Sequence, residues 1–380
     1  MKILYDWQAF NRKFSGVSKC FVELMTNLPE GTEYEISLKY SENEHLLSKN
    51  ARTVNTNIKD MRNFISEKDF FLKRKIYKSF AKLFPRRTSE GVNYYYSIER
   101  LKSGGFDIFH PTFYNEYFLK YLGNKPFVLT VHDMIPESFP ELFKHDSQAR
   151  KKSHLVKLAS HIVAVSQNTK NDLMRFLDVP EEKITVIYHG APEDVDFPKQ
   201  PRLGFQYLLF VGERGRYKNF CPMLVNIADF LKQSHIKLVC THNDFDKSEK
   251  ELIHKLQLDD YVVHVFVNDV ELKNLYCNAF AFVQPSLYEG FGIPILEAYQ
   301  CGCPVFLNNK SVFPEIAGDA AVFFELDNEQ QNLSEKLEAF LSYTDAQKNA
   351  LIEKQQKRLE FFSWKKSAEK LNEVYLSVLK

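Results

Sequence analysis

The sequence predicts an α/β protein built from two Rossmann-like, doubly wound domains that face each other across a cleft. Three observations carry this prediction. Short runs that are apolar on both faces recur along the chain, as the central strands of parallel sheets do. Segments with helical periodicity, such as 17–28, 224–231 and 270–278, separate most of these runs, which favours parallel strands with helical crossovers. A proline-rich break divides the runs into two sets.

The break spans 191–201 and holds three prolines and three acidic residues, which neither a helix nor a central strand accommodates. We therefore expect an N-terminal domain over 1–195 and a C-terminal domain over 202–362. Ligands of such domains bind at the carboxyl ends of the strands. The expected strands are 1–6, 34–38, 107–110, 127–132, 161–166 and 184–188 in the first half, and 207–211, 236–240, 262–267, 279–283, 304–307 and 321–324 in the second.

Composition excludes several classes of protein. The 380 residues carry a formal charge of +1, so no overall field favours nucleic acid. The six cysteines show no C-x-x-C spacing and no accompanying histidine cluster, so we expect no zinc site and no disulfide framework, and free thiols suit a reducing cytoplasm. The first acid comes too early for a signal peptide, and no apolar run is long enough to span a bilayer.

The most informative motif runs from 288 to 298. An apolar run precedes it, Gly290 and Gly292 allow a tight turn, and a helix follows. A glycine loop that leads into a helix N-terminus is suited to anions. Glu289 and Glu297 bracket the loop, and carboxylates accept hydrogen bonds from sugar hydroxyls. The motif therefore predicts a nucleotide-sugar site, and an ordinary strand-turn-helix with two solvated glutamates is the alternative.

A cluster of basic residues follows the strand at 207–211. Arg214, Arg216 and Lys218 lie close together in sequence before the next helix. Such a cluster needs an anion, and a diphosphate leaving group is a natural one. The alternative is a solvated basic turn.

The N-terminal half offers two facing motifs. His132 ends an expected strand and is followed by Asp133, which places both at the edge of the cleft. Gly16 lies in a short loop before a helix, where backbone amides can approach a ligand. The alternatives are a purely structural role for His132 and simple packing of the loop against the helix for Gly16.

Residues 70–87 interleave seven basic residues with aromatic and aliphatic ones at helical spacing. A basic amphipathic helix is a candidate for binding an anionic membrane surface. A helix packed on the sheet with a solvated basic face explains the same pattern equally well.

Taken together, and in their order along the chain, the motifs resemble those of the retaining family 4 glycosyltransferases of the GT-B fold. These enzymes make bacterial surface and capsular polysaccharides among other products. The resemblance covers essentially the whole chain. Glu289 to Glu297 matches the family's E-x7-E element, and 298–305 continues it. Lys218-Asn219 matches the end of the G-x-x-x-x-R-K-N segment, but Tyr217 stands where arginine is commonest.

The resemblance implies a role for each motif. Glu289 contacts the donor sugar, His132 lies beside that sugar, and Lys218 neutralises the leaving diphosphate, with Arg214 in place of the missing arginine. The implied donor-binding residues are Gly16, Gly290, Phe291, Gly292, Glu297 for the ribose, and Val267 near the base. The implied acceptor candidates are His110, Thr112 and Tyr114. The last helix, 363–380, is expected to pack back on the N-terminal domain.

The expected reaction is retaining transfer of a hexose from a GDP- or UDP-sugar to a glycan or lipid-linked acceptor. The product would belong to O-antigen or capsule synthesis, as for a mannosyltransferase. We expect no metal or other cofactor, because the pair Asp194 and Asp196 lies in the break. The expected location is the cytoplasm, with the inner face of the plasma membrane as a candidate. A sugar-nucleotide epimerase and a non-catalytic sugar-nucleotide-binding protein are the alternatives.

Overall fold

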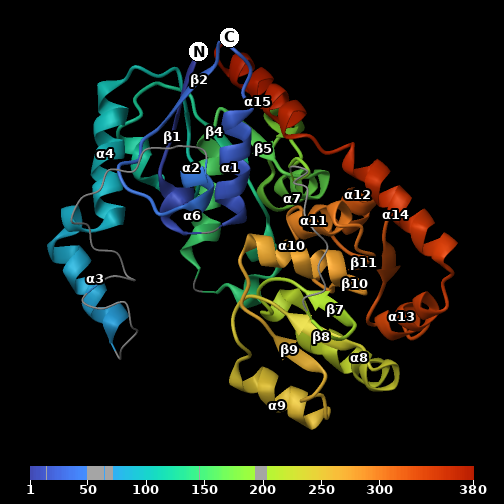
Figure 1. The fold of residues 1–380 in the computed structure, drawn as a ribbon. Coiled ribbons are helices and arrows are strands. Elements are labelled where there is room, and N and C mark those ends of the chain that lie inside the picture. The colour runs from blue at the N-terminus through green and yellow to red at the C-terminus, as the bar shows by residue number, and fades with distance from the viewer. Residues whose placement is uncertain (14, 49–63, 65–71, 145, 193–202) are drawn as a thin grey trace.

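The computed structural model describes residues 1–13, 15–48, 64, 72–144, 146–192 and 203–380. The chain forms two α/β domains, each built on a parallel sheet with helices around it (Figure 1). The twelve expected strands are confirmed, most of them a residue or two shorter than expected. The proline-rich break falls largely on residues outside the described ones.

The N-terminal domain contains six parallel strands. They are β1 (Lys2–Tyr5), β2 (Glu33–Ile36), β3 (Ile108–His110), β4 (Val128–Val131), β5 (His161–Ala164) and β6 (Ile184–Val186). They form two three-stranded ladders, β2-β1-β3 and β4-β5-β6. A parallel bridge from Phe109 to Phe127 links the ladders, so the strands lie as one sheet.

The C-terminal domain contains one six-stranded parallel sheet. Its strands are β7 (Tyr207–Phe210), β8 (Lys237–Cys240), β9 (Val262–His264), β10 (Ala281–Gln284), β11 (Val305–Asn308) and β12 (Val322–Phe324). The spatial order is β12-β11-β10-β7-β8-β9, so the winding reverses between β10 and β7. Ligands of doubly wound sheets bind at this switch point, where the loops after β7 and β10 lie side by side.

Helices connect the strands. In the N-terminal domain they are η1 (Gln8–Asn11), α1 (Gly16–Thr26), α2 (Glu44–Ser48), α3 (Lys73–Leu83), η2 (Pro85–Arg87), α4 (Ser89–Ser103), η3 (Glu116–Lys120), α5 (Ile135–Ser138), η4 (Pro140–Leu142), α6 (Ser147–Leu158), α7 (Gln167–Leu177) and η5 (Glu181–Lys183). In the C-terminal domain they are η6 (Arg216–Lys218), α8 (Phe220–Ser234), α9 (Lys247–Lys255), α10 (Asp269–Asn278), α11 (Ile293–Gln300), α12 (Phe313–Ala317), α13 (Leu333–Leu341) and α14 (Asp345–Leu359).

Polar caps and apolar faces explain why these helices form. Asp246 and Asn268 each complete a capping box with a glutamate three residues on, at the starts of α9 and α10. Ser15 caps α1 by accepting from Val17 N. The same helix buries Phe21 and other apolar residues against the sheet. Local capping therefore fixes where α1 begins, and burial fixes which of its faces looks inward.

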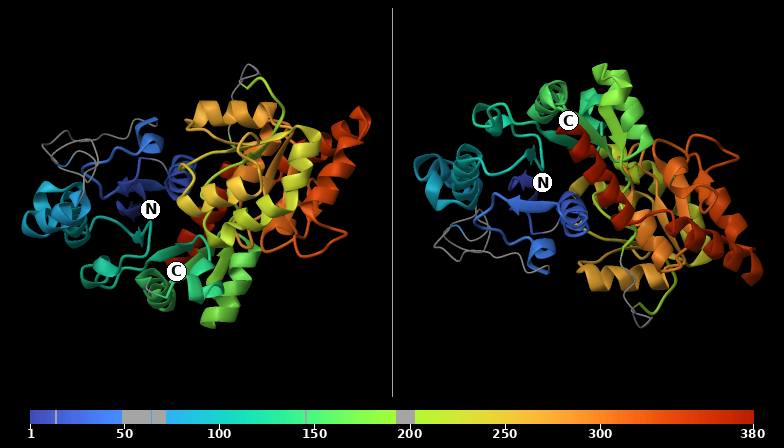
Figure 2. Two further views of the ribbon diagram at one scale, coloured as in Figure 1. Left: turned by 90° about the horizontal axis from the view of Figure 1, so that it is seen from below. Right: turned by 90° about the horizontal axis from the view of Figure 1, so that it is seen from above.

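The last helix, α15 (Trp364–Val378), crosses back onto the N-terminal domain, where it lies beside α1 (Figures 1 and 2). Tyr375 places its hydroxyl 2.6 Å from the Tyr5 hydroxyl and 2.6 Å from His110 Nδ1, deep in that domain. A backbone hydrogen bond of 3.2 Å from Ala191 N to Phe362 O joins the two segments that run between the domains. Both chain termini consequently lie on the N-terminal domain.

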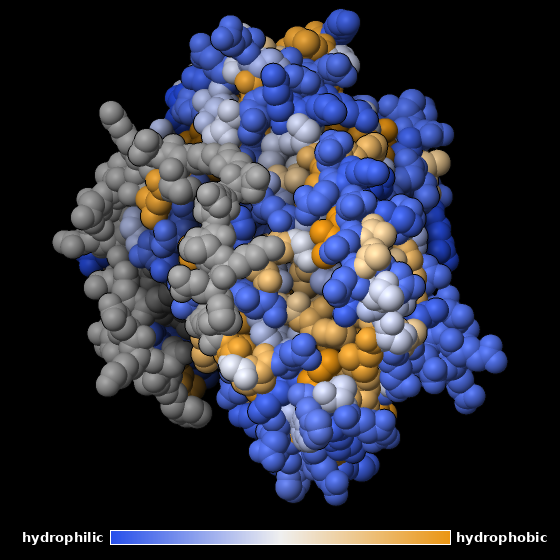
Figure 3. Space-filling view, turned by 45° about the vertical axis from the view of Figure 1, so that its right-hand side comes forward, coloured by the Kyte–Doolittle hydropathy of each residue, from blue (hydrophilic) through white to orange (hydrophobic). Residues whose placement is uncertain are grey.

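None of the described helices is both long and apolar enough to cross a bilayer. Hydrophilic side chains cover most of the face shown in Figure 3, and apolar ones gather toward its centre. The basic segment forms a helix over 73–83, and residues 70–71 lie outside the described ones. Lys73 is buried, whereas Ile76 and Leu83 on the same helix are exposed.

Candidate active site

Glu289 lies in the loop between β10 and α11, and its carboxylate is held on one oxygen. Oε1 accepts hydrogen bonds from Lys218 Nζ at 2.6 Å, Gln284 Nε2 at 3.0 Å and Ser286 Oγ at 2.8 Å. Because three donors fix Oε1, the carboxylate has a defined orientation, and Oε2 is the oxygen that remains to meet a ligand. Two motifs far apart in the sequence thus form one site.

Lys218 ends the short helix η6 at the switch point of the sheet. Burial lowers the pKa of its amine, but the Glu289 carboxylate, together with Tyr217 and Glu213, raises that pKa above its ordinary value. The amine is therefore charged at neutral pH. Leu287 N donates to Tyr217 O at 2.8 Å, which ties the loop after β7 to the loop after β10. A fixed ammonium group next to a glycine loop can stabilise the charge of a departing diphosphate.

Gly290 lies directly against the N-terminal domain. A Cβ atom there would stand 1.8 Å from the carbonyl oxygen of His132, so a larger residue requires the two domains to shift apart. Ser166 Oγ donates to the Gly290 carbonyl at 2.8 Å. Gly292 has a φ of 96° immediately before α11, a conformation that favours glycine. The glycine loop consequently links both domains at the site.

Glu297 on α11 reaches across to the N-terminal domain. Its Oε1 lies 3.0 Å from Nζ of Lys19 on α1, and both side chains are partly exposed. The starts of the two helices also meet, because a Cβ on Gly16 would lie 3.8 Å from Cδ1 of Ile293. Gly16 and the 290–292 loop are thus brought together. Lys19 was not expected at the site, since no spacing in the sequence singles it out.

His132 follows β4 and faces this junction. Burial lowers the pKa of its imidazole to about 4, so the ring is neutral at pH 7. Its backbone N–H donates to the Tyr114 hydroxyl at 3.2 Å, and its ring packs edge-on against Phe21. Among the described residues, Nε2 is buried without a hydrogen-bond partner. A neutral ring with one unpartnered nitrogen is suited to a sugar hydroxyl.

A cluster of sulfur and nitrogen donors surrounds His132, which the sequence pattern did not reveal. Cys20 Sγ lies 3.2 Å from His189 Nδ1, and one donor atom from each of Cys20, His132 and His189 falls within 4.8 Å of the others. Phe291 packs edge-on against His189 with ring centroids 4.5 Å apart. Three separate segments supply the donors, so no short motif predicts them. The set could hold a soft divalent ion, and the expectation of metal-independent activity stays a prediction.

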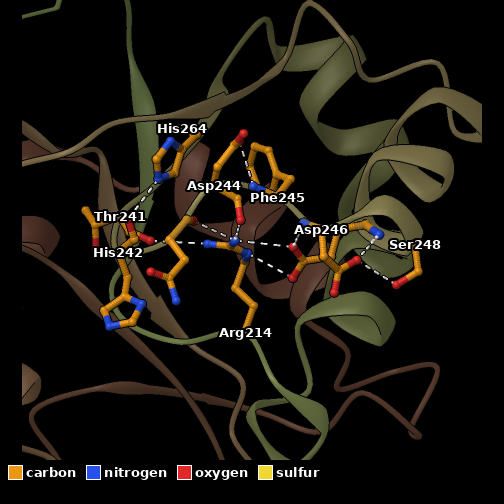
Figure 4. Close-up of polar contacts among 10 residues, drawn as sticks. Arg214, Thr241, His242, Asp244, Phe245, Asp246, Ser248 and His264 are labelled. Atoms are coloured by element: carbon orange, nitrogen blue, oxygen red, sulfur yellow. Dashed lines mark hydrogen bonds and ion pairs between the residues drawn. The ribbon is translucent and has the colours of Figure 1, made fainter. Parts of the chain in front are cut away.

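Arg214 is engaged differently from the expectation. Its Nε and Nη2 donate to Glu249 at 2.9 and 3.2 Å, and further hydrogen bonds reach the carbonyls of the 241–244 loop (Figure 4). The guanidinium also lies 4.6 Å from the ring centroid of Phe245. Both charged side chains are buried. Arg214 therefore holds the loop after β8, and a diphosphate contact would first have to break these bonds.

The other predicted residues lie in or against the apolar cores of the two domains. His110 is fully buried with both ring nitrogens engaged, by Tyr375 and Thr130. Thr112 is buried and bonds to Asp6. Both residues therefore lie in the core of the N-terminal domain with their polar atoms satisfied, and their role toward the acceptor stays a prediction. Val267, after β9, is half-buried and packs on the apolar core of the C-terminal domain.

A cavity of about 200 Å³ opens beside His132 between the two domains. Its walls carry aromatic rings and carboxylates, from Phe113, Tyr114, Asp133, Phe143, Asp146 and, across the cleft, Tyr217. Tyr217 stacks on Phe139 with ring centroids 6.2 Å apart and an interplanar angle of 25°. Of the three acceptor candidates, Tyr114 is the one that lines this cavity.

The two halves of the chain match two family models. Residues 66–195 match the model described as Glycosyltransferase Family 4, and residues 193–358 match Glycosyl transferases group 1. Together the matches span 66–358. The two matches meet at 193–195, between the sheets of the two domains.

Two relatives are named for O-antigen synthesis. The O-antigen chain mannosyltransferase RfbU of Salmonella typhimurium is 32% identical over 53% of this chain and 57% of that protein. The O-antigen chain mannosyltransferase B of Escherichia coli is 25% identical over 85% of this chain and 86% of that protein. The chain thus spans a little over half of the first relative's length and most of the second's.

Solved structures share the architecture. Anabaena HepE, solved with UDP and glucose, superposes with a TM-score of 0.71 over 99% of this chain and all of that one, at 17% identity. WaaG, a glycosyltransferase involved in lipopolysaccharide biosynthesis, superposes with a TM-score of 0.65 over 98% and 99% of the two chains, at 14% identity. These likenesses confirm the expected GT-B fold. On the two family models, the relatives and the fold, the chain belongs to the family 4 glycosyltransferases.

Proposed function

We propose that this glycosyltransferase moves a hexose with retention from a GDP- or UDP-sugar to a glycan or lipid-linked acceptor in the synthesis of a bacterial surface polysaccharide. The observation that carries the proposal is the Glu289 carboxylate, fixed by Lys218 beside the Gly290–Gly292 loop where the domains meet. The names of the O-antigen relatives support the class of product.

The proposed roles follow from the contacts. Glu289 Oε2 accepts from a donor-sugar hydroxyl, and His132 Nε2 bonds a second one. Glu297 takes the ribose hydroxyls, and the amides of the glycine loop meet the diphosphate. Lys218 stabilises the negative charge that develops on the leaving diphosphate, a term that is often the largest in catalysis.

Bond making and breaking then occur on one face of the sugar. The acceptor oxygen attacks the anomeric carbon as the bond from that carbon to the diphosphate oxygen breaks. The electron pair leaves with the diphosphate, which also takes the acceptor proton. His132 is neutral because burial lowers its pKa. Its proposed role is therefore a hydrogen bond to the sugar, without a positive charge to stabilise the leaving group.

The experiment that tests the proposal is a thermal-shift screen with UDP, GDP and their sugars, because a ligand that binds the folded state raises apparent stability. Proton NMR of the product then reports the anomeric configuration, and turnover is repeated in EDTA. Inversion would reject retention, and a loss of turnover that Mn²⁺ restores would reject metal independence. Conversion of the donor without an acceptor would identify an epimerase, and binding without any conversion a non-catalytic binding protein.

We place the acceptor sugar in the aromatic cavity beside His132, where Asp133 and Asp146 can accept hydrogen bonds from hydroxyls and Tyr217 offers a ring face. Replacing Tyr217 with alanine should raise the acceptor KM by about three- to tenfold, because a well-packed aromatic contact contributes about 1 kcal/mol. The donor KM should stay unchanged, and Tyr217→Phe, which keeps the ring, is the control. A rise in the donor KM alone would contradict the placement. Initial rates with each substrate varied in turn make the measurement.

We further propose that α3 binds the anionic inner face of the plasma membrane. Exposed apolar residues, Leu72, Ile76, Leu83 and Phe84, accompany exposed basic ones on and beside this helix. Each basic residue near an anionic surface contributes about 1 kcal/mol. Replacing Arg74, Lys75, Lys78 and Lys82 with glutamate should therefore release the protein from phosphatidylglycerol vesicles in a sedimentation assay. The charge-matched control carries glutamate at Lys354, Lys357, Lys365 and Lys366. Undiminished binding, or none by the unaltered protein, would rule the proposal out.

A further inference from the structure

Each carboxylate of the E-x7-E element already has a cationic partner. Glu289 pairs with Lys218 inside the C-terminal domain at 2.6 Å, and Glu297 pairs with Lys19 of the N-terminal domain at 3.0 Å. The second pair is unusual in one respect, since Glu297 is the group assigned to the ribose. A ribose that takes both carboxylate oxygens of Glu297 would displace Lys19 from Oε1.

The site is also short of positive charge. Tyr217 carries no charge at the position where arginine is commonest in the family, and Arg214 is bound to Glu249 in a buried pair. Arg216, on the same turn, is exposed, and Lys218 is the member of this basic cluster seated against Glu289. A diphosphate group carries two or more negative charges, so a further cation that is close to the site and free to move would match it better.

Lys19 satisfies both conditions. It lies one turn into α1, whose first residue, Gly16, faces Ile293 at the start of α11. Its side chain is 28% exposed, and among the described residues Glu297 is its one ion-pair partner. A lysine side chain is a flexible stem with a compact charge at its end, so it can change partners by rotating its own bonds.

We propose that Lys19 is a second diphosphate-binding cation, which Glu297 holds in the empty site and releases when the ribose arrives. The inference rests on the proposed nucleotide-sugar donor. Glu297 exchanges an ammonium group for two hydroxyls, and Lys19 exchanges a carboxylate for the diphosphate. Neither charged group is left without a partner by this exchange, because the Glu297 carboxylate keeps hydrogen bonds and Lys19 keeps an anion.

The exchange also couples donor binding to the arrangement of the domains. Lys19 belongs to the N-terminal domain, whereas Glu289, Lys218 and the glycine loop belong to the C-terminal one. A diphosphate bound by Lys19 and Lys218 therefore bridges the cleft and holds it closed over the donor, which excludes water from the reacting centre.

Isothermal titration calorimetry with a nucleoside and its diphosphate tests the proposal. UDP and uridine, and GDP and guanosine, are titrated into the unaltered protein, Lys19→Met and Lys19→Arg. We expect Lys19→Met to weaken binding of the favoured diphosphate by about tenfold or more, the loss of one charge-assisted hydrogen bond. Binding of the nucleoside should stay the same or tighten, because Glu297 is freed. Lys19→Arg should keep most of the affinity. Lys170→Met is the control, since the ion pair of Lys170 with Glu181 lies within the N-terminal domain.

Other outcomes separate this inference from the proposed function. If Lys19→Met bound the nucleoside and the diphosphate equally more weakly, Lys19 would only hold Glu297 in position. If neither affinity changed, Lys19 would contact neither ligand. Each of these results would overturn the inference and leave the proposed function standing. Failure of the unaltered protein to bind either diphosphate would overturn the proposed function and the inference with it. Should Lys19→Met not fold, Glu297→Gln gives a second test, because freeing Lys19 should tighten inorganic pyrophosphate and weaken the nucleoside. Unchanged pyrophosphate affinity in that variant would also reject the inference.

Discussion

Replacing Glu289 with alanine is expected to lower kcat by about a hundred- to a thousandfold, the range seen when one preorganised polar contact to a reacting group is removed. The loss has two sources. The donor sugar loses the oxygen that orients it, and Lys218 loses the partner that fixes its position at 2.6 Å. Steady-state turnover with saturating donor and acceptor measures the effect.

The controls separate chemistry from folding. Glu289→Gln keeps an acceptor for Ser286 and Gln284 but removes the charge. Its kcat should therefore fall between that of the unaltered enzyme and that of Glu289→Ala. Glu353→Ala, at an exposed position on α14, should leave kcat unchanged. Thermal unfolding without ligand checks that each variant folds. Turnover by Glu289→Ala within about threefold of the unaltered enzyme would mean that the reaction centre lies elsewhere.

Replacing Arg214 with alanine is expected to destabilise the protein by about 3–5 kcal/mol, because Glu249 would remain buried without its partner. Urea-induced unfolding followed by circular dichroism gives the change in the free energy of unfolding. The loop at 241–246 should also lose order, since the guanidinium donates to three of its carbonyls.

A double replacement distinguishes the cause. Arg214→Met combined with Glu249→Leu removes both charges and should recover much of the lost stability. The exposed pair of Lys232 and Asp229 is the matched control, and breaking it should cost less than about 1 kcal/mol. If Arg214→Ala instead kept full stability and lost affinity for the nucleoside diphosphate, Arg214 would be the ligand that the family pattern suggests.

The sequence was sufficient for the elements and for placing the loops of Lys218 and Glu289 at the same edge of the sheet. Buried strands such as β7 and β10 are readable because all four residues of β7 and the first three of β10 are apolar or aromatic. Once both strands are placed, the doubly wound topology brings their loops together. The pairing of Lys218 with Glu289 then follows, although the two lie 71 positions apart.

The choice of partner for each charge could not be predicted in this way. Arg214 and Lys218 look alike in the sequence, yet one turns toward Glu249 and the other toward Glu289. That choice depends on side-chain directions at the carboxyl edge of the sheet, which periodicity does not encode. The contact of Lys19 with Glu297 is harder still, because it depends on how the two domains are docked.

The hydrogen bond from Ala191 N to Phe362 O has a mechanical consequence. It joins the two segments that run between the domains, and the Ser367 hydroxyl adds a second bond nearby by donating to the Tyr188 carbonyl at 2.6 Å. Both bonds lie beside the point where the chain passes from one domain to the other. Opening of the cleft about this point would preserve them while Gly290 leaves the His132 carbonyl.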